Sequence, residues 1–465
     1  MNSFNRMSIG RLFLVSTFTV VVLWGCVVFL SRQPTDSALL QFLLLTTAMA
    51  VPTLLLLWRC NETKFTLPFW WILISAALLR LMSVAGDPLF EDDYFRYLWD
   101  GYQTVTTNDP YTKAPDTFFD QDVPEPFELI LSFINYPGIA TVYGPVSQWF
   151  FGLAYLIAPG EVWPLQLLSG LGDLIIICLI SRLGAGNALL LYAWSPLILK
   201  EYSLTAHPDV FAVMFAVIGI LAAFRRRALV AGFALGLALG AKIFALLIIP
   251  FLISSDWSIR FWFRFCTAIV ICLTTITAWF GSFRIWVPEG LLAMAESWLF
   301  NSPLYYMLLP TLKFQTIKVI LITSFTIYAM AVLYRRMRRD YIDHLEGEDP
   351  DPGKSLSSRN GTKTPWNQTK AAFRGDWLFA LFLLSLPVIN PWYVAWLLPF
   401  AALYPRWWSW TASFAILLSY WYGSNVGAIG ADSLRLPTGV LLTEYLLIIL
   451  APVTVWLVRR YRRSV

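Results

Sequence analysis

A succession of long apolar runs is the feature that most constrains this chain. A helix needs about 20 apolar residues to cross the hydrocarbon core of a bilayer, and such runs follow one another along most of the sequence. We therefore predict an all-α, polytopic membrane helix bundle with about 12 to 14 membrane segments. The runs are Ile9–Leu30, Ala38–Trp58, Thr66–Ala85, Pro145–Ala158, Trp163–Ile180, Asn187–Tyr202, His207–Phe224, Ala228–Ile253, Phe261–Phe280, Phe314–Tyr334, Trp377–Pro387, Pro391–Leu403, Trp407–Tyr422 and Thr438–Val458.

Composition excludes the common soluble classes. Of 465 residues, 58% are apolar and 14% are charged, whereas an ordinary soluble domain has roughly 45–50% and about 25%. A conventional cytosolic enzyme, a disordered chain and a disulfide scaffold are therefore excluded. The 5 cysteines lack metal-ligand spacing, and 2 histidines leave little scope for a histidine-based zinc site.

Basic clusters predict the orientation of the helices, because Lys and Arg remain on the cytoplasmic side. This rule places both termini in the cytoplasm of a multi-pass cell-membrane protein and the polar stretch 86–142 outside. Pro145–Ala158 is short and is interpreted as interfacial or re-entrant. Ala228–Ile253 must leave and return, so we expect two short helices broken near Gly240–Lys242. The predicted division is 1–85 (three membrane helices), 86–145 (extracytoplasmic catalytic loop), 146–334 (central bundle), 335–375 (flexible cytoplasmic loop) and 376–465 (C-terminal helices).

The outer loop is acidic, with eleven acids against two bases between Gly86 and Leu131. Its densest part is Glu91-Asp92-Asp93, followed by an aromatic segment. If this segment is helical, Asp93, Arg96, Tyr97 and Asp100 fall on one face. Arg96 then neutralises one carboxylate, and the other is free to act as a base at the membrane edge. The alternative is a surface helix with local ion pairs.

Two further features are predicted to face outward. His207 and Asp209 open a helix, near its positive end. Four basic residues break the positive-inside pattern, namely Arg80, Lys200, Lys242 and Arg435. Charges within apolar segments are costly and are therefore often functional, although Arg80 and Lys200 could also snorkel to the interface. Lys242 lies in a glycine-interrupted run, and we expect it to hold a lipid phosphate.

Five short motifs follow one another along the chain: Glu91–Gly101 with Asn108–Tyr111, Tyr136–Pro145, His207–Asp209, Gly240–Phe244 and Asn390–Pro399. Together they resemble the motifs of GT-C glycosyltransferases. They are closest to bacterial family 87-type mannosyltransferases and more distantly similar to the catalytic subunit of glycosylphosphatidylinositol mannosyltransferase I. Two departures stand out: Glu91-x-Asp93 where relatives often have Asp-x-Asp or Ser-Asp-Asp, and Asn390 where His is frequent.

The resemblance implies transfer of a hexose, with mannose expected, from a polyprenyl-phosphate sugar to a hydroxyl of an extracytoplasmic glycan or glycolipid, with inversion. It implies a general base, for which Asp93 is the first candidate, Asp92 the second and Glu91 the third. Lys242 is the first candidate for the donor phosphate, followed by Arg96, Arg80 and Arg435. The candidates for sugar or acceptor binding are His207, Asp209, Asp100, Tyr143, Trp392 and Tyr393.

The expected partners are the lipid-linked donor, the acceptor and the bilayer, with no nucleic acid. No cofactor is expected, although clustered acids could bind a divalent metal such as Mg²⁺. Three alternatives remain open: a transporter or lipid flippase, a non-catalytic membrane scaffold, and a pentosyl- or aminosugar transferase of the same fold.

Overall fold

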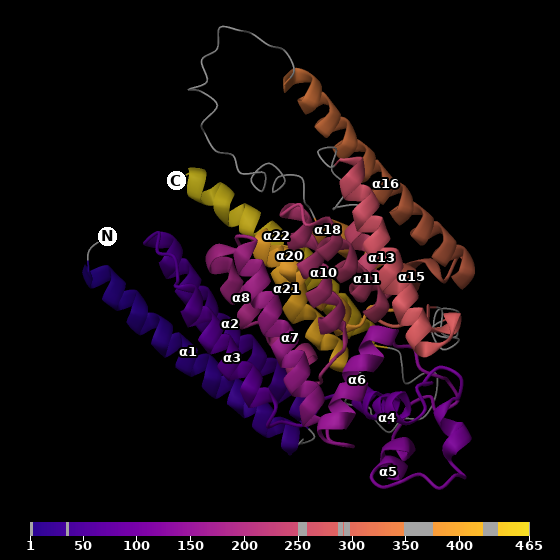
Figure 1. Ribbon diagram of the computed structural model, residues 1–465. Helices are drawn as coiled ribbons and strands as arrows, with labels where there is room; N and C mark the ends of the chain where they lie inside the picture. Colours follow the sequence, from indigo (N-terminus) through magenta and orange to yellow (C-terminus); the bar gives the residue numbers. More distant parts are fainter. Residues whose placement is uncertain are drawn as a thin grey trace.

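The computed structural model describes residues 3–33, 37–249, 258–286, 292, 298–347, 375–421 and 436–464. Within these ranges the regular structure is helical, and one isolated parallel bridge joins Phe300 to Val388. The predicted all-α class is therefore confirmed. Figure 1 shows most helices side by side in one bundle, with α4 and α5 projecting at the end opposite the two termini.

The first three predicted spans are helices. They are α1 (Ser3–Arg32), α2 (Ala38–Glu62) and α3 (Phe69–Ser83), and they lie together at one side of the bundle (Figure 1). The segment after α3 forms short helices at the end of the bundle instead of another span. These helices are α4 (Asp93–Thr106), η1 (Pro115–Phe118) and α5 (Phe127–Ser132), and the longer α6 (Pro145–Ile157) follows.

The central part begins with α7 (Trp163–Arg182). Asn187–Tyr202, predicted as one span, is instead broken, because Pro196 has no N–H for a continuous helix and Ser195 adopts an extended conformation before it. The pieces are η2 (Gly186–Ala188), α8 (Leu189–Ala193), α9 (Pro196–Ile198) and η3 (Leu199–Leu204), the last of which is a π-helix. The chain then turns by 111° before α10 (Asp209–Phe224).

The break predicted in Ala228–Ile253 is confirmed. The helix α11 (Ala228–Ala241) ends where Lys242 becomes extended, with φ −157° and ψ 132°, and the 3₁₀ helix η4 (Ile243–Ile248) follows. After it come α13 (Ile259–Phe280) and η5 (Phe283–Trp286).

The C-terminal part contains another correction. The predicted loop 335–375 begins with helix, since α16 (Phe314–Gly347) continues through a stretch of good helix formers without Gly or Pro until Gly347. Residues 348–374 lie outside the described residues. The remaining helices are α15 (Pro303–Leu308), α18 (Gly375–Ser385), α19 (Pro391–Ala395), α20 (Leu398–Leu403), α21 (Trp407–Ala415), η7 (Ile416–Trp421) and α22 (Thr438–Ser464).

Several helices have the length and surface of membrane spans. Five described helices are long and apolar enough to cross a bilayer, or six if the bent pair around residues 205–208 is one span, and five shorter helices are also apolar. Large apolar side chains on the outer faces are exposed, including Phe18 at 69% and Phe263 at 72%. The number of 12 to 14 segments stays a prediction.

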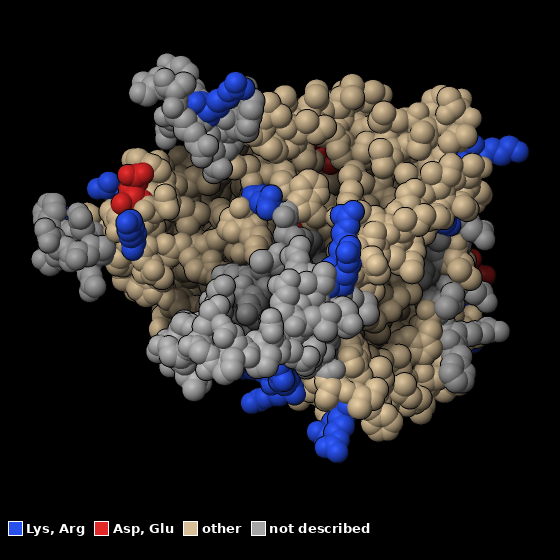
Figure 2. Space-filling model, turned by 90° about the horizontal axis from the view of Figure 1, so that it is seen from above, with Lys and Arg blue, Asp and Glu red and all other residues tan. Residues whose placement is uncertain are grey.

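Charge differs between the two ends of the bundle. Figure 2 views the end opposite α4, where the coloured side chains are mostly Lys and Arg. Arg225, Arg226 and Arg227, which connect α10 to α11, are all at least partly exposed at that end. The acidic segment that carries α4 lies at the other end (Figure 1).

Two glycines allow the close packing that places the outer helices. A Cβ on Gly101 of α4 would lie 2.5 Å from the carbonyl oxygen of Phe151 in α6. A Cβ on Gly144, directly before α6, would lie 2.3 Å from the carbonyl oxygen of Gly240 in α11. Since no side chain fits at either position, α4 contacts α6 directly, and the start of α6 contacts the end of α11.

Candidate active site

Asp93 is the first residue of α4, at the end of the bundle where that helix projects. Its side chain is 37% exposed, and its Oδ2 accepts a hydrogen bond of 3.2 Å from the hydroxyl of Tyr143. Tyr143 precedes α6, and its ring packs edge-on against Tyr97 of α4 with the centroids 5.1 Å apart. Asp93 is therefore held in place and still accessible from outside.

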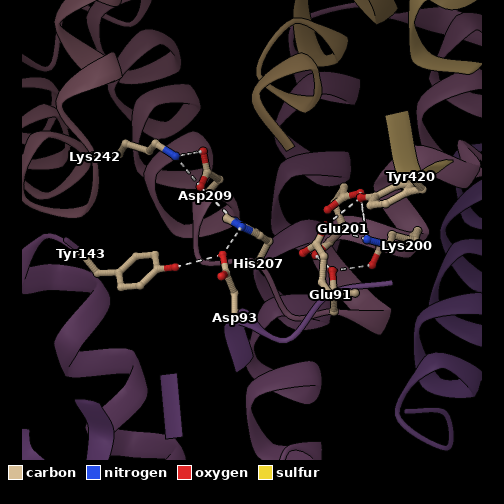
Figure 3. Close-up of polar contacts among 10 residues, drawn as sticks. Glu91, Asp93, Tyr143, Lys200, Glu201, His207, Asp209, Lys242 and Tyr420 are labelled. Atoms are coloured by element: carbon tan, nitrogen blue, oxygen red, sulfur yellow. Dashed lines mark hydrogen bonds and ion pairs between the residues drawn. The ribbon is translucent and has the colours of Figure 1, made fainter. Parts of the chain in front are cut away.

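His207 connects Asp93 to the membrane helices (Figure 3). Its Nε2 lies 3.8 Å from Asp93 Oδ2, and its Nδ1 lies 3.1 Å from Asp209 Oδ2. The imidazole stacks on Trp392 of α19, with the ring centroids 4.0 Å apart and the planes at 23°. The ring is thus fixed between two carboxylates by a stacked aromatic side chain.

The buried carboxylate of Asp209 accepts hydrogen bonds from several side chains, one of which is Lys242. The Nζ of Lys242 lies 2.7 Å from both carboxylate oxygens of Asp209, and the indole of Trp396 donates to Oδ1 at 2.6 Å. Lys242 also lies 4.4 Å from the ring centroid of Tyr393. Trp396 was not predicted as a site residue, although it stands four residues after Trp392 and so shares a helical face with it.

The pKa values of the two adjacent aspartates are shifted in opposite directions. Burial and the charge of Asp93 raise the pKa of Asp92 to about 6. Burial would also raise the pKa of Asp93, but its contacts with His207 and Tyr143 outweigh that effect and lower the pKa below its ordinary value. Both carboxylates are mostly ionised at neutral pH, and Asp93 stays ionised at a lower pH than Asp92, as suits a general base.

Asp100 lies on the same helix but has a different environment. It is 2% exposed, and it accepts hydrogen bonds from Thr141 and, at 2.9 Å, from the amide of Gln148. Burial raises the pKa of Asp100, although Arg96, Gln148 and Thr141 act against it. These contacts fix the segment that leads to Tyr143, so Asp100 supports the site from within the protein.

Arg96 does not pair with either carboxylate on its face, which corrects the sequence interpretation. Its guanidinium donates instead to the backbone carbonyls of Ile139 at 2.9 Å, Tyr136 at 3.2 Å and Asn135 at 3.4 Å. Backbone carbonyls in an irregular loop lack sheet or helix partners, and an arginine with five donors satisfies several of them at once.

Two further phosphate ligands were predicted, Arg80 and Arg435. Arg80 is 2% exposed and pairs with Asp173 of α7 at 2.6 Å, so its charge is already balanced by a buried carboxylate. Arg435 lies outside the described residues.

Glu91, the third candidate base, belongs to a second polar cluster beside the first (Figure 3). Its Oε1 lies 2.8 Å from the Nζ of Lys200, and neighbouring contacts involve Glu201 and Tyr420. Within the described part of the chain, no group of three or more His, Cys, Asp or Glu side chains is arranged to hold a metal ion.

Comparison with known proteins places the chain in a family. A family model described as alpha-(1->6)-mannopyranosyltransferase, N-terminal domain, matches residues 13–256, more than half of the chain. This chain belongs to that family. The resemblance to bacterial mannosyltransferases is thereby confirmed, whereas the relation to glycosylphosphatidylinositol mannosyltransferase I is only distant.

Membership makes the chain a glycosyltransferase, and its apolar helices make it a membrane protein. The comparisons with curated proteins and with solved structures gave no match. The matched stretch contains Asp93, His207, Asp209 and Lys242, while Trp392, Tyr393 and Trp396 lie beyond it. The site at the end of the bundle thus takes side chains from both the family domain and the C-terminal helices.

Proposed function

We propose that this protein transfers mannose, with inversion, from a polyprenyl phosphate to a hydroxyl of an extracytoplasmic glycan or glycolipid, and that Asp93 is the general base. The observation that carries the proposal is the row Asp93, His207, Asp209, Lys242, in which each side chain contacts the next. A base at one end and a cation at the other are the two groups that such a transfer requires.

The proposed step is a single displacement. The acceptor oxygen bonds to C1 of the sugar, the bond from C1 to the phosphate oxygen breaks, and Asp93 takes the hydroxyl proton. Positive charge develops on the sugar ring in the transition state, as in glycoside hydrolysis. Asp93 suits this role because it is ionised at neutral pH and is exposed, while Asp209 is 1% exposed and fully engaged with its donors.

Lys242 is the proposed ligand of the leaving phosphate. An ammonium group has three N–H donors, and Lys242 has two carboxylate oxygens of Asp209 at 2.7 Å. The third donor remains for a phosphate oxygen, and the side chain is 22% exposed. The Asp209 carboxylate fixes Lys242 in place before substrate binds, so little reorganisation is needed as negative charge develops.

A lipid-linked donor fits the position of the site. The helices around it expose apolar faces suited to lipid, and the site lies at the end of the bundle, where a phosphate at the bilayer surface would meet it. The prenyl chain of the donor would then stay in the hydrocarbon core.

The test is a donor comparison with the purified protein in detergent. A short-chain polyprenyl-phosphate mannose and a nucleotide-diphosphate mannose are each supplied with an alkyl α-mannoside acceptor, and products are identified by mass spectrometry. We expect transfer from the lipid donor alone, with inversion at C1. Transfer from the nucleotide donor alone, or retention at C1, would contradict the proposal.

A further inference from the structure

The second polar cluster consists of Glu91, Lys200, Glu201 and Tyr420 (Figure 3). Glu91 precedes α4, Lys200 and Glu201 lie in the π-helix η3, and Tyr420 lies in η7. Lys200, Glu201 and Tyr420 are at most 5% exposed, and the Glu91 side chain is 11% exposed. Three distant parts of the chain therefore meet in one buried ionic group.

The contacts within this cluster are dense. Lys200 Nζ lies 2.8 Å from Glu91 Oε1 and 3.4 Å from Glu201 Oε1. The Tyr420 hydroxyl contacts both glutamates and Lys200, and the ammonium lies 3.8 Å from the centroid of its ring. A single cation, Lys200, thus contacts two carboxyl groups, so the loss of one member changes the contacts of the others.

One side of the cluster fixes the backbone that leads to Asp93. Glu91 directly precedes the Asp92-Asp93 pair, and Phe90 before it has a φ of +63°, which a bulky residue rarely adopts. The ring of Phe90 packs against Tyr420 with the centroids 5.8 Å apart. Tyr420 therefore holds this segment twice, through the ring of Phe90 and through the carboxylate of Glu91.

The other side fixes the backbone that leads to His207. The N–H of His207 donates to the carbonyl of Glu201 at 2.8 Å, and the N–H of Thr205 donates to the carbonyl of Lys200 at 2.9 Å. Ala206 between them has a φ of +55°. Strained positions of this kind persist only when their surroundings determine them.

We propose that Glu91, Lys200, Glu201 and Tyr420 are positioning residues that set the separation of Asp93 and His207. This inference rests on the proposed function of Asp93. The cluster lies where the segments before Asp93 and before His207 meet, and the two side chains are 3.8 Å apart. Since a displacement of about 1 Å can cost roughly 10²-fold in rate, loosening this cluster lowers kcat more than it raises KM.

A matched pair of variants tests the proposal. Tyr420→Phe removes one buried hydroxyl from this cluster, and Tyr192→Phe removes one from the buried Arg80–Asp173 pair, where the hydroxyl donates to Asp173 at 2.7 Å. Both variants lose a hydrogen bond to a buried ion pair, so we expect similar losses of thermal stability. We expect kcat to fall about tenfold in Tyr420→Phe, with KM changed less than threefold, and both constants to stay within twofold in Tyr192→Phe.

A second set of variants tests the charge pairing. Lys200→Met leaves two buried carboxyl groups without their cation, and Glu91→Gln in the same chain removes one of those charges. We expect the double variant to recover at least about threefold in kcat over Lys200→Met, because an uncompensated buried charge costs more than a missing pair.

Hydrogen–deuterium exchange separates this inference from the proposed function. Peptides covering 87–97 and 203–209 should exchange faster in Tyr420→Phe than in Tyr192→Phe, whether or not the chosen donor is used. Faster exchange in Tyr420→Phe together with no transfer by the wild type would contradict the proposed function and support the positioning role of the cluster. Unchanged kcat and unchanged exchange in Tyr420→Phe would overturn the positioning role.

Discussion

Asp92 and Asp93 are neighbours in sequence with identical side chains, so only their surroundings give their carboxyl groups different pKa values. Asp93 contacts His207 and Tyr143, while Asp92 is half-buried next to another negative charge. The assignment of the base is therefore a question about the pKa of each carboxyl group, which kinetics can answer.

The pH dependence of kcat distinguishes the two residues. A general base acts in its ionised form, so activity falls as the pH drops through its pKa. The contacts with His207 and Tyr143 lower the pKa of Asp93 from its ordinary value, whereas burial and the charge of Asp93 raise the pKa of Asp92 to about 6. We expect kcat to be constant between pH 7 and pH 5. A base with the pKa of Asp92 would keep only about one tenth of its activity at pH 5, and that result would reassign the base.

Lys242 offers a test of phosphate binding. Lys242→Gln should raise the KM for the lipid donor by about tenfold or more, because a hydrogen bond to a charged group contributes roughly 1.5–3 kcal/mol. The KM for the acceptor should stay within about twofold. Equal changes in both KM values would indicate that the substitution disturbs the whole site instead of the phosphate contact.

At the residue scale the sequence predicted several of the side chains that meet, but it did not predict how they pair. Lys242 was identified because charges are rare in apolar segments, and His207 and Asp209 were identified because they open a helix near its positive end. Asp209 lies between His207 and Lys242 and contacts both, an arrangement that depends on the 111° turn before α10 and the break at Lys242. Pairing of this kind is a property of the tertiary structure and leaves no local pattern.

At the scale of the elements, a substitution can test whether the contact between the start of α6 and the end of α11 matters for the site. Gly144→Ala would place a Cβ 2.3 Å from the carbonyl oxygen of Gly240, and the resulting shift would separate Tyr143 from Lys242. We expect at least about a tenfold loss of kcat, as small displacements at a site are costly.

The matched control for Gly144→Ala is Gly172→Ala. The added methyl group there would lie 3.6 Å from Val210, an ordinary contact distance, and alanine also favours the helix α7. Gly172→Ala should keep wild-type activity. If Gly144→Ala were equally active, the close approach of α6 and α11 would not matter for the site.

Most helices were predictable because a long apolar run in a membrane protein has few alternatives to a helix. The exceptions have local causes. Pro196 interrupts the run 187–202, and polar helix formers extend α16 beyond its apolar part to Gly347. Hydropathy detects burial in lipid, and it detects neither a missing N–H nor a polar helix that continues past a membrane segment.

For the whole molecule, the proposed function requires the α4 end to face the outside. In a chain whose exposed Cys26 and Cys266 are replaced by Ser, a cysteine at the exposed position Asp120 should react with an impermeant maleimide in intact cells. A cysteine at the exposed position Arg226, at the opposite end, should react only after the membrane is opened. The reverse labelling pattern would place the site in the cytoplasm and contradict the proposal.

The most direct measurement is the rate of mannose transfer by Asp93→Asn, with Asp92→Asn as its neighbouring control. Asparagine has the shape of aspartate and can still accept the hydrogen bond from Tyr143, but it cannot take a proton. The account predicts a loss of at least about 100-fold in kcat for Asp93→Asn and a change of less than about threefold for Asp92→Asn. Near wild-type transfer by Asp93→Asn would contradict it.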